Sequence, residues 1–192
     1  GFSMYTDYLN RAIRDLSGEP TEPSLEKTPV CEIDLETGAF IPDEYIPDVH
    51  TRLVLYQRIA DCEDSAALYD LKLELIDRFG LLPAETKMLF QITGVRIKGE
   101  AAGIKKLRYG ARGGRVGFLP DATVAAHRFA SLLAEHSALF SMNGPLELAL
   151  PAGLEEPELR AILTDWLLDT LDESNEIKPL PSEIKDNLAN AS

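Results

Sequence analysis

Between residues 48 and 103, three successive stretches place apolar side chains every three or four residues, which is the spacing of one buried face of an α-helix. Asp48 precedes the first stretch and the pair Asp64-Ser65 the second, and these residue types cap helix N-termini. Gly80 follows the second stretch, where a left-handed glycine is common. Pro83 suits the first turn of the third helix, and Gly103 ends it. The apolar stripes are Leu53, Tyr56, Ile59 and Ala60; Leu68, Leu71, Leu75, Ile76 and Phe79; and Met88, Ile92 and Val95.

After residue 103 the pattern changes to short alternating segments. Residues 104–118 predict a β-hairpin around the glycine-rich turn 110–114, and residues 140–148 predict a second one with its turn at Asn143-Gly144. A helix over about 121–136, with Val124, Leu132 and Leu133 inward, separates the two hairpins. A last helix begins near Glu155, and its apolar stripe is Leu159, Ile162, Leu163, Trp166, Leu167 and Leu171.

These segments predict an α+β fold: a helical first half, then two β-hairpins that alternate with helices, all around one shared core. A strand is also expected over 31–35, where Cys31, Ile33 and Leu35 alternate with acids. For the domain organisation we expect a short terminal helix at 1–16, a proline-containing linker at 17–29, one domain at 30–172 and a flexible acidic tail at 173–192.

The composition argues against several classes of protein. Acidic residues outnumber basic ones 32 to 19, for a net charge of −13, which disfavours sequence-blind binding of nucleic acid by the whole chain. No apolar run approaches the roughly 20 residues of a membrane span, and the start has no signal-peptide pattern. Two cysteines, Cys31 and Cys62, suit a reducing cytoplasm. Because position 1 is not Met, we expect a piece of a longer protein.

Motifs for catalysis, cofactors and metals are missing from the sequence. There is no phosphate-binding loop and no dinucleotide motif, and the glycines at 110–114 lie between two strands. His50, His127 and His136 have no partner at ligand spacing, so we expect no metal site. The cysteines have no evident base partner. We therefore expect no catalytic residue, no cofactor and no enzymatic activity in this chain.

An acidic stripe is one of two features that stand out. Asp70, Glu74 and Asp77 follow the i, i+4, i+7 spacing that places them on one helix face, largely opposite the leucines. They can form a solvated face, with Lys72 and Arg78 as nearby compensating charges. Alternatively, they form a docking face for a basic partner, in which each carboxylate that meets an arginine makes a charge-assisted contact.

The other feature is a local reversal of charge. Residues 96–115 hold seven basic residues and one acidic residue, whereas residues 32–48 hold six acids and no base. The two segments can pair within the chain. Alternatively, the basic hairpin contacts DNA or an acidic partner through Lys105, Lys106, Arg108, Arg112 and Arg115.

Two runs of sequence resemble a known family. Residues 40–53 (FIPDEYIPDVHTRL) with 56–60 (YQRIA), and residues 74–83 (ELIDRFGLLP), are similar to the C-terminal domain of the bacterial transcription-repair coupling factor, Mfd. The order of helices and hairpin also matches over roughly 27–172. Residues 1–16, which begin Gly-Phe-Ser-Met-Tyr, resemble the last helix of that family's translocase module. The tail beyond Asp172 does not match.

The resemblance implies a regulatory module. In that family the full-length protein is an ATP-driven translocase on double-stranded DNA that displaces stalled RNA polymerase and recruits UvrA, and ATP and Mg belong to its motor. The C-terminal domain folds back on an N-terminal UvrB-like domain, masks the UvrA-binding surface and restrains the motor. The family's acidic contact residues fall on Glu74 and Asp77, and Arg78 is expected either to join the contact or to pair with Glu74.

The resemblance also sets what we expect of the chain itself: a monomeric, non-catalytic, autoinhibitory piece of a cytoplasmic protein, without a cofactor of its own and without contact to a membrane. The competing hypothesis is an accessory DNA-contacting domain that uses the basic hairpin 104–118. A salt-dependent gel shift by the isolated chain would separate the two, because only the second expects one.

Overall fold

The computed structural model describes residues 31–122, 124 and 126–190. The helix predicted at 1–16 and the linker predicted at 17–29 lie outside these residues. The chain divides into two compact units: a helical unit, residues 38–93, and a sheet unit, residues 31–37 and 94–190. The α+β class is confirmed. Each unit contains buried apolar side chains, such as Leu55, Ile59 and Leu75 in the helical unit and Leu107, Val116 and Leu163 in the sheet unit.

The helical unit contains α2 (Val49–Ala60), α3 (Ser65–Phe79) and the first part of α4 (Ala84–Ala101). Both predicted N-caps are confirmed: the Asp48 carboxylate accepts the Thr51 N–H at 2.7 Å, and the Asp64 carboxylate accepts the Ala67 N–H at 2.8 Å. The predicted stripes are largely buried. Leu53, Ala60, Ile76 and Phe79 are only half-buried, and in α2 the fully buried Leu55 was not predicted.

The turn after α3 is fixed by a glycine and a tyrosine. Gly80 has a φ of +88° as predicted, but its ψ of −167° places it outside the left-handed helical region. Its N–H donates to Ile76 O at 2.9 Å, and its carbonyl accepts the Tyr45 hydroxyl at 2.9 Å. The Tyr45 ring also contacts Phe79 edge-on. The segment before α2 therefore holds the end of α3 in place.

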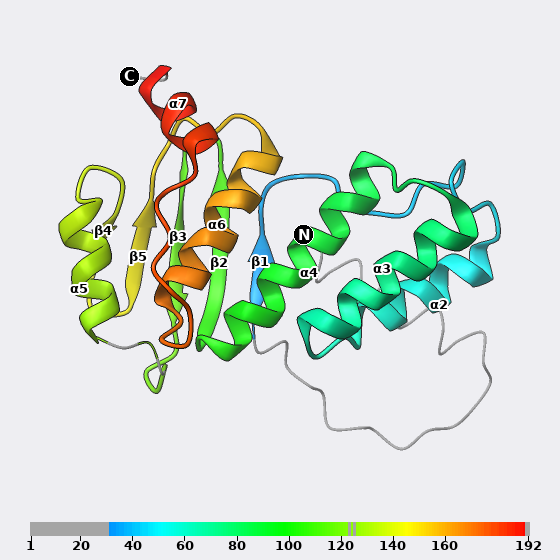
Figure 1. The fold of residues 1–192 in the computed structure, drawn as a ribbon, viewed down its shortest axis with the longest axis horizontal. Coiled ribbons are helices and arrows are strands. Elements are labelled where there is room, and N and C mark those ends of the chain that lie inside the picture. Colours follow the sequence, from blue (N-terminus) through cyan, green and yellow to red (C-terminus); the bar gives the residue numbers. More distant parts are fainter. Residues whose placement is uncertain (1–30, 123, 125, 191–192) are drawn as a thin grey trace. The chain divides into compact units, whose positions relative to one another are not determined.

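The sheet unit is built on five strands in the order β1-β2-β3-β5-β4 (Figure 1). Strand β1 (Glu32–Asp34) pairs in parallel with β2 (Ile104–Gly110), and the other pairs are antiparallel. Strand β3 (Gly113–Phe118) completes the first predicted hairpin, which is confirmed. Strands β4 (Ser141–Met142) and β5 (Glu147–Leu150) form the second, although its loop spans 143–146 instead of two residues.

Side chains alternate across the sheet between a buried face and an outer face. The buried side chains include Ile33, Leu107, Tyr109, Val116 and Leu148. Helix α6 (Pro157–Leu171) crosses one face of the sheet and contacts β2, and it buries Leu163 and Leu167 completely (Figure 1). Helix α5 (Ala126–Glu135) packs on α6 and begins later than the predicted residue 121, because residues 119–122 form a turn in which the Ala122 N–H donates to Leu119 O.

The expected flexible tail is corrected over its described part, residues 173–190. It contains helix α7 (Ser182–Asn190), whose Ile184 is fully buried, and Leu180 before it is also buried. Arg128 of α5 donates to the carbonyls of Glu173 and Asn175, and the Trp166 indole N–H donates to Lys178 O at 3.0 Å. Burial of two aliphatic side chains and these bonds to the backbone hold the segment against the sheet unit.

Candidate functional site

The outer face of α3 carries the predicted acidic stripe. Asp70 and Asp77 are exposed and Glu74 is half-buried, whereas Leu68, Leu71 and Leu75 on the opposite face are buried. The placement of the three acids on one side of the helix is thus confirmed. The same side also carries Tyr69 and Leu73, which are exposed despite their size, and Leu81 is exposed just beyond the helix. The sequence analysis missed these apolar residues, although the four-residue spacing of Tyr69 and Leu73 beside the acids is visible in the sequence.

Glu74 is paired within the chain. It accepts two hydrogen bonds from Arg58 of α2, with Nη1–Oε1 at 2.8 Å and Nη2–Oε2 at 2.5 Å, and one from Arg78 at 2.9 Å. The hydrogen bonds from Arg58 and then Arg78 lower the pKa of Glu74 from 4.5 to about 2. The predicted pairing of Arg78 with Glu74 is confirmed. Glu74 therefore joins α2 to α3, and its charge is already matched by two arginines.

Asp70 and Asp77 differ from Glu74. Within residues 31–122, 124 and 126–190, neither carboxylate makes an ion pair or a hydrogen bond to another side chain. Exposed carboxylates without an internal partner are available to a basic group from outside the chain. Asp70 and Asp77 are therefore the acids of this helix face whose charge is not offset by an ion pair within the described residues.

The basic hairpin is largely matched by acids of the same sheet. The register places Glu32 opposite Lys106 and Asp34 opposite Arg108, and the Lys106 Nζ lies 2.9 Å from Glu32 Oε2. Arg108 Nε lies 3.7 Å from Asp34 Oδ2 and 3.6 Å from Glu36 Oε1. This confirms the predicted pairing between the basic segment and residues 32–48.

Within residues 31–122, 124 and 126–190, three of the five predicted basic contact residues lie near an acid and two do not. Arg115 lies 3.5 Å from Glu147 on β5, so its charge too is offset inside the sheet. Lys105 and Arg112 are exposed and form no ion pair with the part of the chain that the structure describes. The hairpin thus offers a partner two isolated cations, not a continuous basic patch. This geometry does not favour DNA contact through it.

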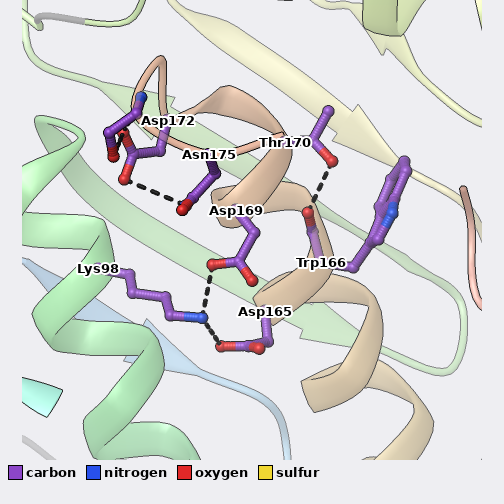
Figure 2. A network of polar contacts seen from close by, with 8 residues as sticks. Lys98, Asp165, Trp166, Asp169, Thr170, Asp172 and Asn175 are labelled. Carbon is purple, nitrogen blue, oxygen red and sulfur yellow. Dashed lines mark hydrogen bonds and ion pairs between the residues drawn. The ribbon is translucent and has the colours of Figure 1, made fainter. Parts of the chain in front are cut away.

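A second carboxylate–cation cluster joins α4 to α6 in the sheet unit. Figure 2 shows Lys98 of α4 pointing between Asp165 and Asp169, which lie one turn apart on α6, with Nζ–Oδ1 distances of 2.6 and 2.7 Å. Burial opposes the charge of Lys98, but the two hydrogen bonds outweigh it and raise the pKa of its ammonium group. This cluster was not predicted, and its signal in the sequence is the i, i+4 pair of acids Asp165 and Asp169 within the apolar stripe of the helix.

A buried arginine holds the beginning of α6 against β1. Arg160 is only 3% exposed, and its guanidinium donates to Leu35 O at 3.0 Å and to the carbonyls of Leu154 and Glu155, both at 2.8 Å. Its hydrogen-bond partners among the described residues are backbone oxygens. The arrangement stabilises the fold and leaves no donor set for a ligand. Nothing in the sequence pattern distinguishes Arg160 from an exposed helix arginine.

The remaining candidates for chemistry form no site among the described residues. No group of three His, Cys, Asp or Glu side chains there could hold a metal ion. His136 packs edge-on against Trp166, and His127 lies 3.6 Å from Glu173. Burial raises the pKa of the Cys31 thiol to about 12, which suppresses the reactive thiolate. None of the helices described is long and apolar enough to cross a membrane.

Comparison with known proteins identifies the class of domain. Residues 35–129 match the model of the TRCF domain. The chain is 38% identical over 173 residues to the transcription-repair-coupling factor of Haemophilus influenzae, and 34% identical over 178 residues to that of Escherichia coli. These alignments cover 89% and 92% of the chain but 15% of each relative. The chain therefore spans about a seventh of the length of these curated relatives.

A solved structure agrees with the fold. The crystal structure of a C-terminal domain of transcription-repair coupling factor superposes with a TM-score of 0.62 and 23% identity, covering 76% of this chain and 96% of that one. The resemblance that the sequence predicted is thus confirmed. The chain belongs to the transcription-repair coupling factor family and carries its C-terminal TRCF domain.

Proposed function

We propose that this chain is the autoinhibitory C-terminal domain of a full-length transcription-repair coupling factor. It docks through the outer face of α3 on the N-terminal UvrB-like domain of the same protein, masks the UvrA-binding surface and restrains the motor. The observation that carries the proposal is the pair Asp70 and Asp77, which are exposed and form no ion pair with the described residues, on a helix whose third acid is already paired. The family supports the same location, because its contact segment includes Asp77.

The docking needs only a weak interface. A domain on the same polypeptide meets its partner at a high effective concentration, so a contact of modest affinity holds the closed state. A ligand that favours the open state by a few kcal/mol then releases it. In this proposal RNA polymerase and double-stranded DNA act on the domain only through the rest of the full-length protein. The chain works in the cytoplasm as a non-catalytic monomer without a cofactor, while ATP and Mg serve the motor.

Glu74 and Arg78 have a structural role beside the docking surface in this proposal. Since Glu74 bridges Arg58 and Arg78, we assign the three residues to holding α3 on α2 and to setting the rim of the docking surface. Substitution of Glu74 would therefore disturb the fold of the surface as well as its charge. The informative variants are the two aspartates.

The test measures retention of the full-length protein on immobilised UvrA. We expect the double variant Asp70→Asn, Asp77→Asn to raise retention at least about tenfold at low salt, which corresponds to about 1.4 kcal/mol lost from the closed state. The matched control is Asp61→Asn with Glu63→Gln, which removes two exposed acids from the same unit. Equal retention by the wild type and the aspartate variant would reject docking through Asp70 and Asp77.

A further inference from the structure

On the outer face of α3, Tyr69 and Leu73 form an exposed apolar row, and Leu81 is exposed just beyond the helix. Beside them lie Asp70 and Asp77, which make no ion pair with the residues that the structure describes. We propose, on the basis of the proposed function, that this row anchors the docking and that the aspartates only orient it. We call Tyr69, Leu73 and Leu81 the apolar ridge. Its occupant is then a protein surface with an apolar pocket bordered by arginine or lysine, which under the proposed function belongs to the N-terminal domain.

The exposure of the ridge is unusual for this helix. Tyr69 is 58% exposed, Leu73 46% and Leu81 85%, whereas Leu68, Leu71 and Leu75 of the same helix are buried. Tyr69 and Leu73 are four residues apart and so lie one turn apart on one side. A single exposed leucine needs no explanation, but aligned large side chains beside polar groups are typical of interaction surfaces.

The end of the ridge is held rigidly. Leu81 follows Gly80, whose φ of +88° suits glycine. The Gly80 N–H donates to Ile76 O and its carbonyl accepts the Tyr45 hydroxyl, each at 2.9 Å. The backbone that carries Leu81 is therefore fixed before any partner arrives. Anchors that are already in place lose less conformational freedom on binding.

The charges of the same face cannot supply most of the docking energy. Glu74 is matched by Arg58 and Arg78, which leaves Asp70 and Asp77 as the acids without an ion pair among the residues that the structure describes on this face. Pairs formed by exposed carboxylates are weak and are screened by salt. Burial of large apolar side chains is stronger and is not screened. Because Asp70 and Asp77 are negative, the partner surface that binds this face needs arginine or lysine at the border of its apolar pocket.

The dependence of retention on salt concentration distinguishes docking through apolar side chains from docking through ion pairs. Full-length protein is tested for retention on immobilised UvrA at about 0.05 M and about 0.5 M NaCl, in the range where ionic contacts fade. We expect the wild type to remain weakly retained at both concentrations. Leu73→Ala with Leu81→Ala should raise retention about tenfold or more at both. Asp70→Asn with Asp77→Asn should raise retention above that of the wild type at low salt and change it little at high salt.

A matched control comes from α2 of the same unit. Val49 and Val54 are 58% and 42% exposed, so Val49→Ala with Val54→Ala removes comparable apolar surface away from the ridge. Retention of this control should equal that of the wild type. Circular dichroism of each variant checks that the helices remain folded.

The outcomes distinguish the two proposals. If the aspartate variant releases the domain but the leucine variant does not, the ridge is not the anchor and the proposed function stands. If high salt alone opens the wild type, the docking is an ionic latch and the inference is likewise overturned. If neither variant raises retention at either salt concentration, docking through α3 is wrong, and the ridge proposal with it.

Discussion

The outer face of α3 and the outer face of the sheet are both crowded with charge, yet they use it differently. On the sheet, Lys106, Arg108 and Arg115 each lie within 3.7 Å of an acid on a neighbouring strand or the adjoining turn. On α3, among the residues that the structure describes, Glu74 is matched in this way and Asp70 and Asp77 are not. The comparison teaches that a dense cluster of charges marks a binding surface only where the fold has not already supplied the partners.

Sheet pairing explains the difference. Parallel pairing of β1 with β2 sets two residues of the acidic segment directly opposite two of the basic segment, although about 70 residues separate them. A helix offers its outer face only local neighbours at i±3 and i±4, together with whatever an adjacent element provides. For α3 that element is α2, which supplies Arg58 at one edge.

The largest effect is expected from the buried cation of the sheet unit. Arg160→Met should lower the free energy of unfolding by about 3–5 kcal/mol, because it leaves several buried carbonyls without a donor. Arg58→Met, which removes an exposed cation from the helical unit, should lower it by about 1 kcal/mol or less. Urea unfolding monitored by circular dichroism measures both, and fluorescence of the single tryptophan, Trp166, reports on the sheet unit. Equal losses would remove the distinction between internal and surface cations.

A smaller effect is expected from exchanging charges on the two outer faces. Arg108→Glu places a carboxylate beside Asp34 and Glu36, so we expect a loss of about 1 kcal/mol of stability. Asp77→Arg should stay within about 0.5 kcal/mol of the wild type, because no ion pair of the described chain depends on Asp77. Urea midpoints of both variants provide the measurement. A clear loss in the second variant would show that Asp77 has a structural partner.

The smallest effect concerns acid titration of Glu74. Its pKa is lowered from 4.5 to about 2 in the folded chain, so the unfolded chain takes up the proton more readily as the pH falls. The stabilisation by Glu74 is therefore complete above about pH 5 and is lost between about pH 5 and pH 2. The difference in urea midpoint between the wild type and Glu74→Gln should shrink over that range. A difference that stays constant down to pH 2.5 would contradict the pairing with Arg58 and Arg78.

Much of the local structure was predictable. The caps Asp48 and Asp64, both hairpins and the side of α3 that carries the acids followed from residue type and spacing. The family resemblance was equally visible, because its motifs are contiguous. The folded segment after Asp172 was not predicted, because the four-residue spacing of Leu180, Ile184 and Leu188 is short and lies among polar residues and prolines. Leu180 and Ile184 are nevertheless buried, which the sequence alone does not show.

Within the candidate site, spacing predicted where the acids point but only partly which of them are paired. An i, i+4 neighbour such as Arg78 could be anticipated for Glu74, whereas Arg58 comes from another helix. The apolar ridge was not predicted, because the sequence does not show that these large side chains remain exposed.

What the amino-acid order alone determined is local: which segments become helices or hairpins, where they start, and which side of each is apolar. These properties depend on neighbours within about one turn or one hairpin. Only the tertiary structure decided which charges meet, as when Lys98 reaches Asp165 across 67 positions and Arg160 reaches Leu35 across 125. The physical reason is that such contacts arise from the packing of whole elements, so no short stretch of sequence contains both partners.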